Sequence, residues 1–276
     1  MFTLGTLFEL LLTLLLASVP LSALRQYTLR RSKSSHLFIP PSVYDSRSPC
    51  PALNALANHS ILCVYRHVPY LAVFRYIFSR PHNGCNISAF QLIIALREHY
   101  HISLPLAILL SVGGTFMCGR NFKIDLQDLA RHNVLEHNAS LTRADAMPGG
   151  RYAPVAIDKN LLQHLLDVSP DSDVLTFDDL VTARANRDAT LRKPFNRVHA
   201  LISRGAVALT VQTLGDEEGN IPKQCIREWF GEERLPHRWA RPMTAIGLWS
   251  TYRISNWVGQ LVKTKLTHIT ADSIFR

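Results

Sequence analysis

The sequence predicts a mainly α-helical, single-domain protein, and three observations support this. Apolar residues recur at helical spacing in most segments of the 276-residue chain. Several of these segments begin at a residue that suits a helix N-terminus, such as Asp158 or Thr176. No alternation of strands with helices and no internal repeat is visible. The length and apolar content suffice for one substantial core.

The expected helices follow one another with clear start and stop signals. Asp125, Asp158 and Thr176 stand directly before apolar periodic runs, and Pro194 precedes the last of them. The glycine-containing segments 113–114, 148–150 and 215 are expected breaks. The helices are expected over residues 52–61, 89–99, 126–133, 159–166, 177–190 and 195–214.

Composition excludes several classes of protein. Hydrophobic residues make up 47% of the chain and charged residues 18%, which excludes a disordered chain. The formal net charge is +9, yet the basic residues are scattered and no Lys/Arg run exceeds Arg30-Arg31. We therefore expect a solvated basic surface and no nucleic-acid partner.

The N-terminal segment predicts export. Residues 10–24 are apolar apart from small Thr, Ser and Pro residues, and small side chains near Ala23 suit cleavage by signal peptidase. Residues 1–23 are interpreted as a signal peptide and 24–43 as a linker, so the protein is expected to be secreted or to lie in the secretory pathway. The first eight residues carry no Lys or Arg. An uncleaved membrane anchor is therefore the alternative, and only then is a membrane a partner.

Cys50 is the strongest candidate for chemistry. It stands between Pro49 and Pro51, directly before a predicted helix, and proline suits the first helical position. Free N–H groups and the positive end of the helix dipole then surround the sulfur and favour a thiolate. Such a thiolate can be an axial ligand of haem. The structural alternative is a buried cysteine that acts as a small hydrophobe.

Three segments in order resemble one family. They are Ser48-Pro49-Cys50-Pro51 continuing to His59, Glu136-His137-Asn138-Ala139-Ser140, and Glu232-Glu233-Arg234-Leu235-Pro236 followed by Trp239. Over residues 44–249 the chain resembles the fungal haem-thiolate peroxidases, the chloroperoxidase and unspecific-peroxygenase family. Residues 250–276 are expected to form a C-terminal tail.

The resemblance implies a chloroperoxidase-like helical fold enclosing haem b, with Cys50 as the axial ligand of the iron. It also implies that Glu136, His137 and Ser140 hold a divalent cation, Mg²⁺ or Mn²⁺, beside the haem. The structural alternative is that Ser140 caps a helix and Glu136 ends the previous one. The implied enzyme is an oxidoreductase that uses hydrogen peroxide to oxidise a small organic substrate. A tailoring role in fungal secondary metabolism, on a polyketide or mycotoxin, follows by analogy alone.

Two departures from the family pattern concern proton transfer. Asn138 replaces an aspartate, and Ala206 occupies the position of the family's acid–base glutamate. Alanine cannot take a proton from peroxide and return it to the leaving oxygen. His137 is a candidate proton relay, and His199, two helical turns before Ala206, is a weaker one. The alternative function is a haem-binding relative with little or no catalysis.

Two further features are specific to this chain. Residues 62–80 exceed the family pattern and are interpreted as an insertion near the haem or as translated intron sequence. Asn86-Ile87-Ser88 is a glycosylation acceptor in an expected loop. The cysteines other than Cys50 have no spacing typical of a disulfide framework.

Overall fold

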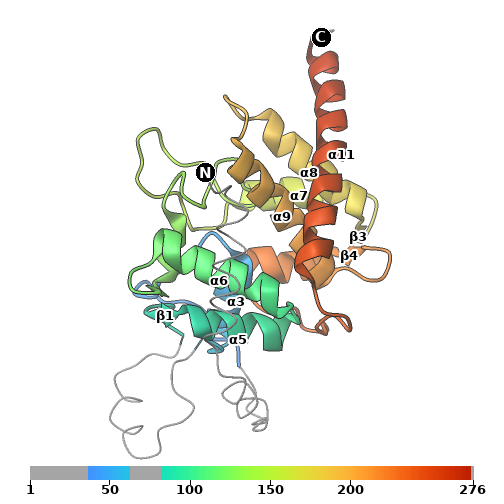
Figure 1. Cartoon of the computed structure of the whole chain (residues 1–276). Coiled ribbons are helices and arrows are strands. Elements are labelled where there is room, and N and C mark those ends of the chain that lie inside the picture. The colour runs from blue at the N-terminus through green and yellow to red at the C-terminus, as the bar shows by residue number, and fades with distance from the viewer. Residues whose placement is uncertain (1–36, 63–81, 275–276) are drawn as a thin grey trace, which may run out of the picture. The chain divides into compact units, whose positions relative to one another are not determined.

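Helices are the main regular structure in the computed structural model, which describes residues 37–62 and 82–274 (Figure 1). The predicted mainly α class is confirmed. The predicted N-caps Asp158 and Thr176 accept hydrogen bonds from the backbone of their helices, and Gly215 ends a helix as expected. Residues 1–23, 24–36 and most of the 62–80 segment, on which several predictions fall, lie outside the described residues.

The predicted helices 52–61, 89–99, 159–166 and 177–190 are found close to their predicted bounds, whereas the helices Leu104–Cys118 and Leu248–Ile274 were not predicted. Residues 126–133, predicted as a helix, form only a short 3₁₀ turn, and the last predicted helix begins at Arg197 rather than at residue 195. The helical elements are α3 (Pro51–Asn58), α5 (Ala89–Tyr100), α6 (Leu104–Cys118), η1 (Leu126–Ala130), α7 (Lys159–Leu166), α8 (Phe177–Ala189), α9 (Arg197–Leu214), α10 (Lys223–Ile226), the π-helical turn η2 (Arg227–Gly231) and α11 (Leu248–Ile274).

Strands are short and serve as clasps between loops. β1 (Ile87–Ser88) pairs antiparallel with β2 (Lys123–Ile124), with Ile87 opposite Ile124. β3 (Val174–Leu175) pairs antiparallel with β4 (Ile221–Pro222), with Leu175 opposite Ile221. The inward-facing members of both pairs are buried, so each clasp also closes the core.

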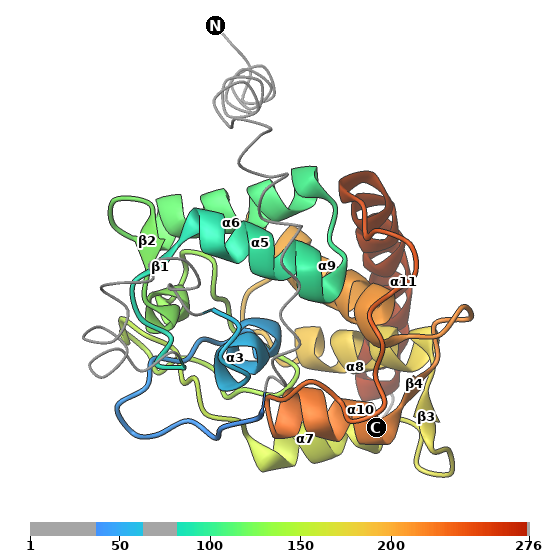
Figure 2. The same cartoon turned by 90° about the horizontal axis from the view of Figure 1, so that it is seen from below.

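The α5–α6 pair corrects one prediction. Gly113 and Gly114 were expected to break a helix, but both lie inside α6, which packs along α5 (Figures 1 and 2). Each glycine costs a helix about 1 kcal/mol relative to alanine. The burial of Leu106, Ala107 and Cys118 offsets that cost, because each of these side chains is at least 97% removed from solvent.

The residues predicted as a C-terminal tail continue α11, which packs against α8 and α9 (Figure 1). Its inner stripe consists of Thr251, Ser255, Val258 and Val262, all buried. Gly259 allows the guanidinium of Arg204 to lie against the α11 backbone, because a Cβ there would come within 2.7 Å of the Arg204 nitrogen.

The core joins these helices around α3. Leu56 and Ala57 of α3 belong to the same buried cluster as Leu180 of α8 and Val258 of α11. Residues from Leu37 onward form one compact unit. Within the residues that the structure describes, no helix is long and apolar enough to cross a membrane.

Candidate functional site

Cys50 is the N-cap residue of α3, as its prolines predict. Its backbone is extended (φ −89°, ψ 112°), and Pro51 opens the helix. The hydroxyl of Tyr100 donates a hydrogen bond to the carbonyl of Ala52 at 2.7 Å, which ties the first turn of α3 to α5. Tyr100 packs edge-on against Trp229 and Trp239, so the turn that carries Cys50 is braced by aromatic rings.

Opposing influences act on the Cys50 thiol. Burial raises its pKa, while the backbone N–H groups of Leu53 and Ala52 and the charge of Arg143 favour the thiolate. For comparison, burial also raises the pKa of the Cys225 thiol, and nearby Glu228 adds to that rise. Of these two thiols, Cys50 has helix-start N–H donors and a cation beside it, although burial outweighs them and the pKa of Cys50 is raised overall.

Ser48 and Asn54 hold the loop before Cys50. The side-chain amide of Asn54 donates to the carbonyl of Ser48 at 2.8 Å and accepts from the Ser48 backbone N–H at 2.8 Å. The Ser48 hydroxyl in turn accepts from the N–H of Cys50 at 3.1 Å. Asn54 therefore hydrogen-bonds to the backbone of the loop that carries Cys50.

Asn58 bridges two distant segments one turn further along α3. Its Oδ1 accepts from Nε and Nη2 of Arg47 at 3.0 and 2.6 Å, and its Nδ2 donates to the Glu233 carbonyl at 2.9 Å. His59, the C-cap residue, accepts from the backbone N–H of Leu235 through Nε2 at 3.2 Å. Both side chains thus fasten α3 to the 232–236 segment instead of only capping the helix.

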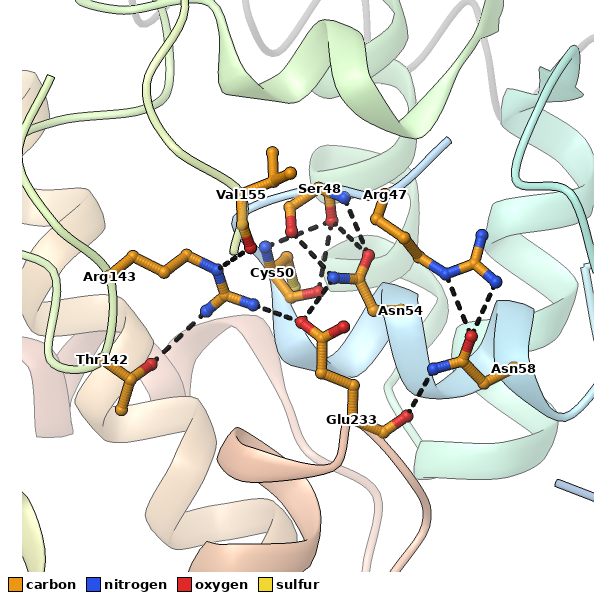
Figure 3. Close-up of polar contacts among 9 residues, drawn as sticks. All are labelled: Arg47, Ser48, Cys50, Asn54, Asn58, Thr142, Arg143, Val155 and Glu233. Atoms are coloured by element: carbon orange, nitrogen blue, oxygen red, sulfur yellow. Dashed lines mark hydrogen bonds and ion pairs between the residues drawn. The ribbon is translucent and has the colours of Figure 1, made fainter. Parts of the chain in front are cut away.

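Glu233 and Arg143 complete this network. The Glu233 carboxylate accepts from Nδ2 of Asn54 at 2.6 Å and forms an ion pair with Arg143 (Figure 3). Arg143 also donates to the Val155 carbonyl at 3.0 Å and is 98% buried. We call these residues the Cys50 frame: Arg47, Ser48, Cys50, Asn54, Asn58, Arg143 and Glu233. The sequence analysis singled out the segment that contains Glu233 but missed Arg47 and Arg143.

The predicted cation site lies on the loop after η1. Nδ1 of His132 contacts Oε2 of Glu136 at 2.7 Å, and burial raises the pKa of the Glu136 carboxyl. Nδ1 of His137 contacts the carbonyl of Asn138 at 2.7 Å. Among the described residues, no three His, Cys, Asp or Glu side chains converge as in a metal site. Cation binding by the Glu136 carboxylate, a His137 ring nitrogen and the Ser140 hydroxyl stays a prediction.

Two arginines of α8 shape this loop. Arg184 donates to the Ala139 carbonyl at 2.6 Å and Arg187 to the Ser140 carbonyl at 2.7 Å. Ala139 adopts a left-handed conformation (φ 60°), and its N–H donates to Asp145 at 2.7 Å. The two arginines therefore hold this loop through its backbone carbonyls.

Asn138 keeps part of the role expected of an aspartate. Its Oδ1 accepts from the Ala146 N–H at 3.0 Å. The negative charge that Asn138 lacks is present nearby on Asp145, which pairs with Arg187 at 2.8 Å. The turn thus retains an acidic group despite the departure at 138.

His137 meets two rings near the start of α9. Its ring centroid lies 4.8 Å from that of Phe195 and 5.9 Å from that of His199. Burial lowers the pKa of His137 from 6.5 to about 4, so the ring is neutral at physiological pH. A carbonyl oxygen only accepts, so the contact with Asn138 places the proton on Nδ1 and leaves the lone pair on Nε2. We call His137, Phe195 and His199 the His137 cluster.

His199 is buried, and Asn196 orients it. The side-chain amide nitrogen of Asn196 lies 3.1 Å from Nδ1 of His199 and is a donor, so Nδ1 accepts. Ala206 lies seven residues later on the same face of α9 and is exposed. The helix therefore presents a histidine and an alanine along one face, two turns apart.

Asn86, the predicted glycosylation acceptor, is exposed beside β1. Its N–H donates to Asp125 at 2.6 Å, and Ser88 of the same motif caps α5 by accepting from the N–H of Gln91. The acceptor side chain is thus accessible, while the attachment of a sugar stays a prediction.

Comparisons with known proteins agree with this arrangement. The family model described as "Peroxidase, family 2" matches residues 36–63 and 70–244. A chloroperoxidase of Leptoxyphium fumago is 26% identical, over 75% of this chain and 58% of that protein. The aromatic peroxidase fscJ of Fusarium equiseti is 24% identical, over 77% of this chain and 56% of that protein. The chain spans somewhat more than half the length of these curated relatives. Because the family model covers most of the chain, including Cys50 and the 136–140 and 232–236 segments, the protein belongs to peroxidase family 2.

Proposed function

We propose that this protein is a haem-thiolate peroxidase that uses hydrogen peroxide to oxidise a small organic substrate. The observation that carries the proposal is the position of Cys50 at the start of α3, inside a frame of buried hydrogen bonds. This donor chemistry fits haem b bound through a thiolate, because amide N–H groups and Arg143 favour a charged sulfur against the opposing effect of burial. The haem, when bound, supplies the redox chemistry that reduces peroxide.

His137 is the proton acceptor in this proposal. Peroxide cleavage requires a base that takes one proton and delivers it to the leaving oxygen. Nε2 of His137 carries a free lone pair at neutral pH, which suits the first step. His199 lies next to it in the His137 cluster.

Other parts of the proposal rest on the resemblance. As a second assignment for the same residues, Glu136, His137 and Ser140 would hold Mg²⁺ or Mn²⁺, and the buried carboxylate of Glu136 would supply the negative charge. A cation on the His137 ring would use Nε2, so in that assignment His137 is a ligand and not the base. The name of the Fusarium relative makes aromatic compounds the first substrates to test. Secretion and a tailoring role in secondary metabolism are also proposed.

The second candidate is a haem-binding protein with little catalysis. Ala206 favours it, because the exposed methyl group at this position of α9 cannot transfer a proton. The two candidates share the haem and Cys50, and they differ in the rate at which peroxide reacts.

The test is reconstitution of the purified full chain with haemin. The ferrous–CO spectrum should show the long-wavelength band of a thiolate ligand, and stopped-flow mixing with peroxide should show rapid spectral change. A protein that takes up no haem would refute both candidates. Haem uptake without a reaction with peroxide would favour the second.

A further inference from the structure

The buried ion pair between Arg143 and Glu233 lies beside Cys50 and has no role in the proposed function. Both side chains are buried, at 2% and 10% exposure, and such charges rarely lie inside a protein without a partner. Both exert electrostatic influence on the Cys50 sulfur, Arg143 favouring its charged form and Glu233 opposing it. Figure 3 shows the pair beside Cys50, with Asn54 between the carboxylate and the loop.

A continuous set of hydrogen bonds joins the pair to Cys50. Glu233 accepts from Asn54 at 2.6 Å, Asn54 accepts from the Ser48 hydroxyl at 3.0 Å, and that hydroxyl accepts from the Cys50 N–H at 3.1 Å. Asn54 and Ser48 are fully buried, so no water competes for these bonds. The charge pair therefore reaches the ligand residue both through space and through this chain of bonds.

A second contact from α3 fixes the backbone of Glu233. Asn58 donates to the Glu233 carbonyl at 2.9 Å, and the residue adopts a left-handed conformation (φ 53°). One helix, α3, thus binds Glu233 twice, through its side chain and through its main chain. Such a strained and doubly held residue is expected where a precise position of the carboxylate matters.

We propose that Glu233 and Arg143 are positioning residues that act through Cys50, setting the electrostatic field at the haem-binding sulfur. The pair carries no net charge, so its field at the sulfur is a balance of two opposite contributions. Removal of either charge leaves the other one buried and uncompensated beside the ligand, where a low dielectric strengthens its effect. This role rests on the proposed function, because it concerns haem held by Cys50.

The test compares the reduction potential of the haem in charge-neutralising variants of the reconstituted full chain. Glu233→Gln leaves the Arg143 charge, which favours the reduced haem, so the potential should shift to more positive values. Arg143→Gln leaves the carboxylate and should shift the potential in the negative direction. The double variant should return toward the wild-type value. Glu232→Gln is the matched control, since this exposed neighbour carries the same charge and pairs with Arg234 at the surface, and it should leave the potential unchanged.

Opposite signs separate an electrostatic role from a structural one. If the pair only supported the fold, both single variants would alter the ferrous–CO band and the potential in the same direction. Shifts of equal sign, or none beyond that of Glu232→Gln, would overturn the proposal. If one single variant fails to fold, the sign in the other and the return in the double variant still decide. A wild-type chain that binds no haem would instead overturn the proposed function, and this role with it.

Discussion

The Cys50 frame and the His137 cluster differ in how firmly the chain holds them. In the frame, three segments far apart in sequence are joined by buried hydrogen bonds and an ion pair, and Asn54 and Asn58 are fully buried. The cluster consists of ring contacts, with its polar bonds made to near neighbours in sequence such as Asn138 and Asn196.

This difference shows where the sequence can vary. A substitution in the frame leaves a buried charge or amide without a partner, which is costly. On the face of α9 near the cluster, by contrast, Ala206 is exposed and Gly205 has open space around it. The side that would hold the iron is therefore constrained by folding itself, whereas the side that would move protons is constrained only by function.

The largest effect is expected from Cys50→Ala, which should abolish the thiolate band and any peroxide-dependent activity. The other described thiols lack helix-start donors that favour the thiolate together with Arg143. Ferrous–CO spectra of the haem-reconstituted variant provide the measurement. Cys225→Ala is the control and should keep the band. The ligand assignment is wrong if Cys50→Ala keeps the band and Cys225→Ala loses it.

The next largest effect is expected from Ala206→Glu, which tests whether the acid–base side is limited by a missing carboxylate. A general acid–base group contributes about 10²–10⁴-fold to the step that it serves. Because Ala206 is exposed on the face of α9 that carries His199, a longer side chain should fit. Stopped-flow rates with peroxide should rise in Ala206→Glu and not in Ala206→Gln, which has similar size without the carboxylate. Equal rates in a folded, haem-replete Ala206→Glu protein would show that this position is not the vacated site.

The sequence predicted those helices whose ends and apolar faces are marked by residues close together in the chain. Residues 159–166 match α7 because Asp158 caps the helix and its apolar spacing is clear. The sequence analysis missed α6, since its stretch is apolar on nearly every face and has no helical period to detect. It also missed α11, whose buried stripe includes Thr251 and Ser255 and so does not look apolar.

The same reasoning separates the predicted from the unpredicted parts of the site. Pro51 places Cys50 at the start of a helix from local chemistry alone. The partnership of Arg143 with Glu233 joins residues 90 positions apart, and no local pattern encodes it. The family motifs mark both segments, but which side chains meet depends on how α3 packs against η2.

A smaller effect, on stability, is expected from Asn58→Ala. The variant removes the acceptor of two Arg47 bonds and the donor to the Glu233 carbonyl, and it leaves these buried groups without that partner. The free energy of unfolding should fall by about 1–3 kcal/mol. Urea denaturation of the haem-free protein measures this. Asn160→Ala, at an exposed position of α7, should change it by no more than about 0.5 kcal/mol. Similar values for the two variants would show that the bridge to Arg47 contributes little.

The smallest effect at neutral pH is a pH dependence that arises in the His137 cluster. Burial lowers the pKa of His137 to about 4, whereas its ordinary value is 6.5. Between these values the unfolded chain binds a proton that the folded chain does not, so acidification favours unfolding. The contribution of His137 is fully present above pH 6.5 and is lost as the pH falls toward 4, with a slope on the order of 1 kcal/mol per pH unit. Glu136 acts in the opposite direction, because burial raises its pKa and protonation removes the cost of a buried negative charge.

The comparison of wild type with His137→Gln isolates the histidine: unfolding free energies from pH 4.5 to 7 should depend less steeply on pH in the variant. Parallel curves of unfolding free energy against pH would mean that burial does not keep the ring neutral. That result would contradict the assignment of His137 as the base.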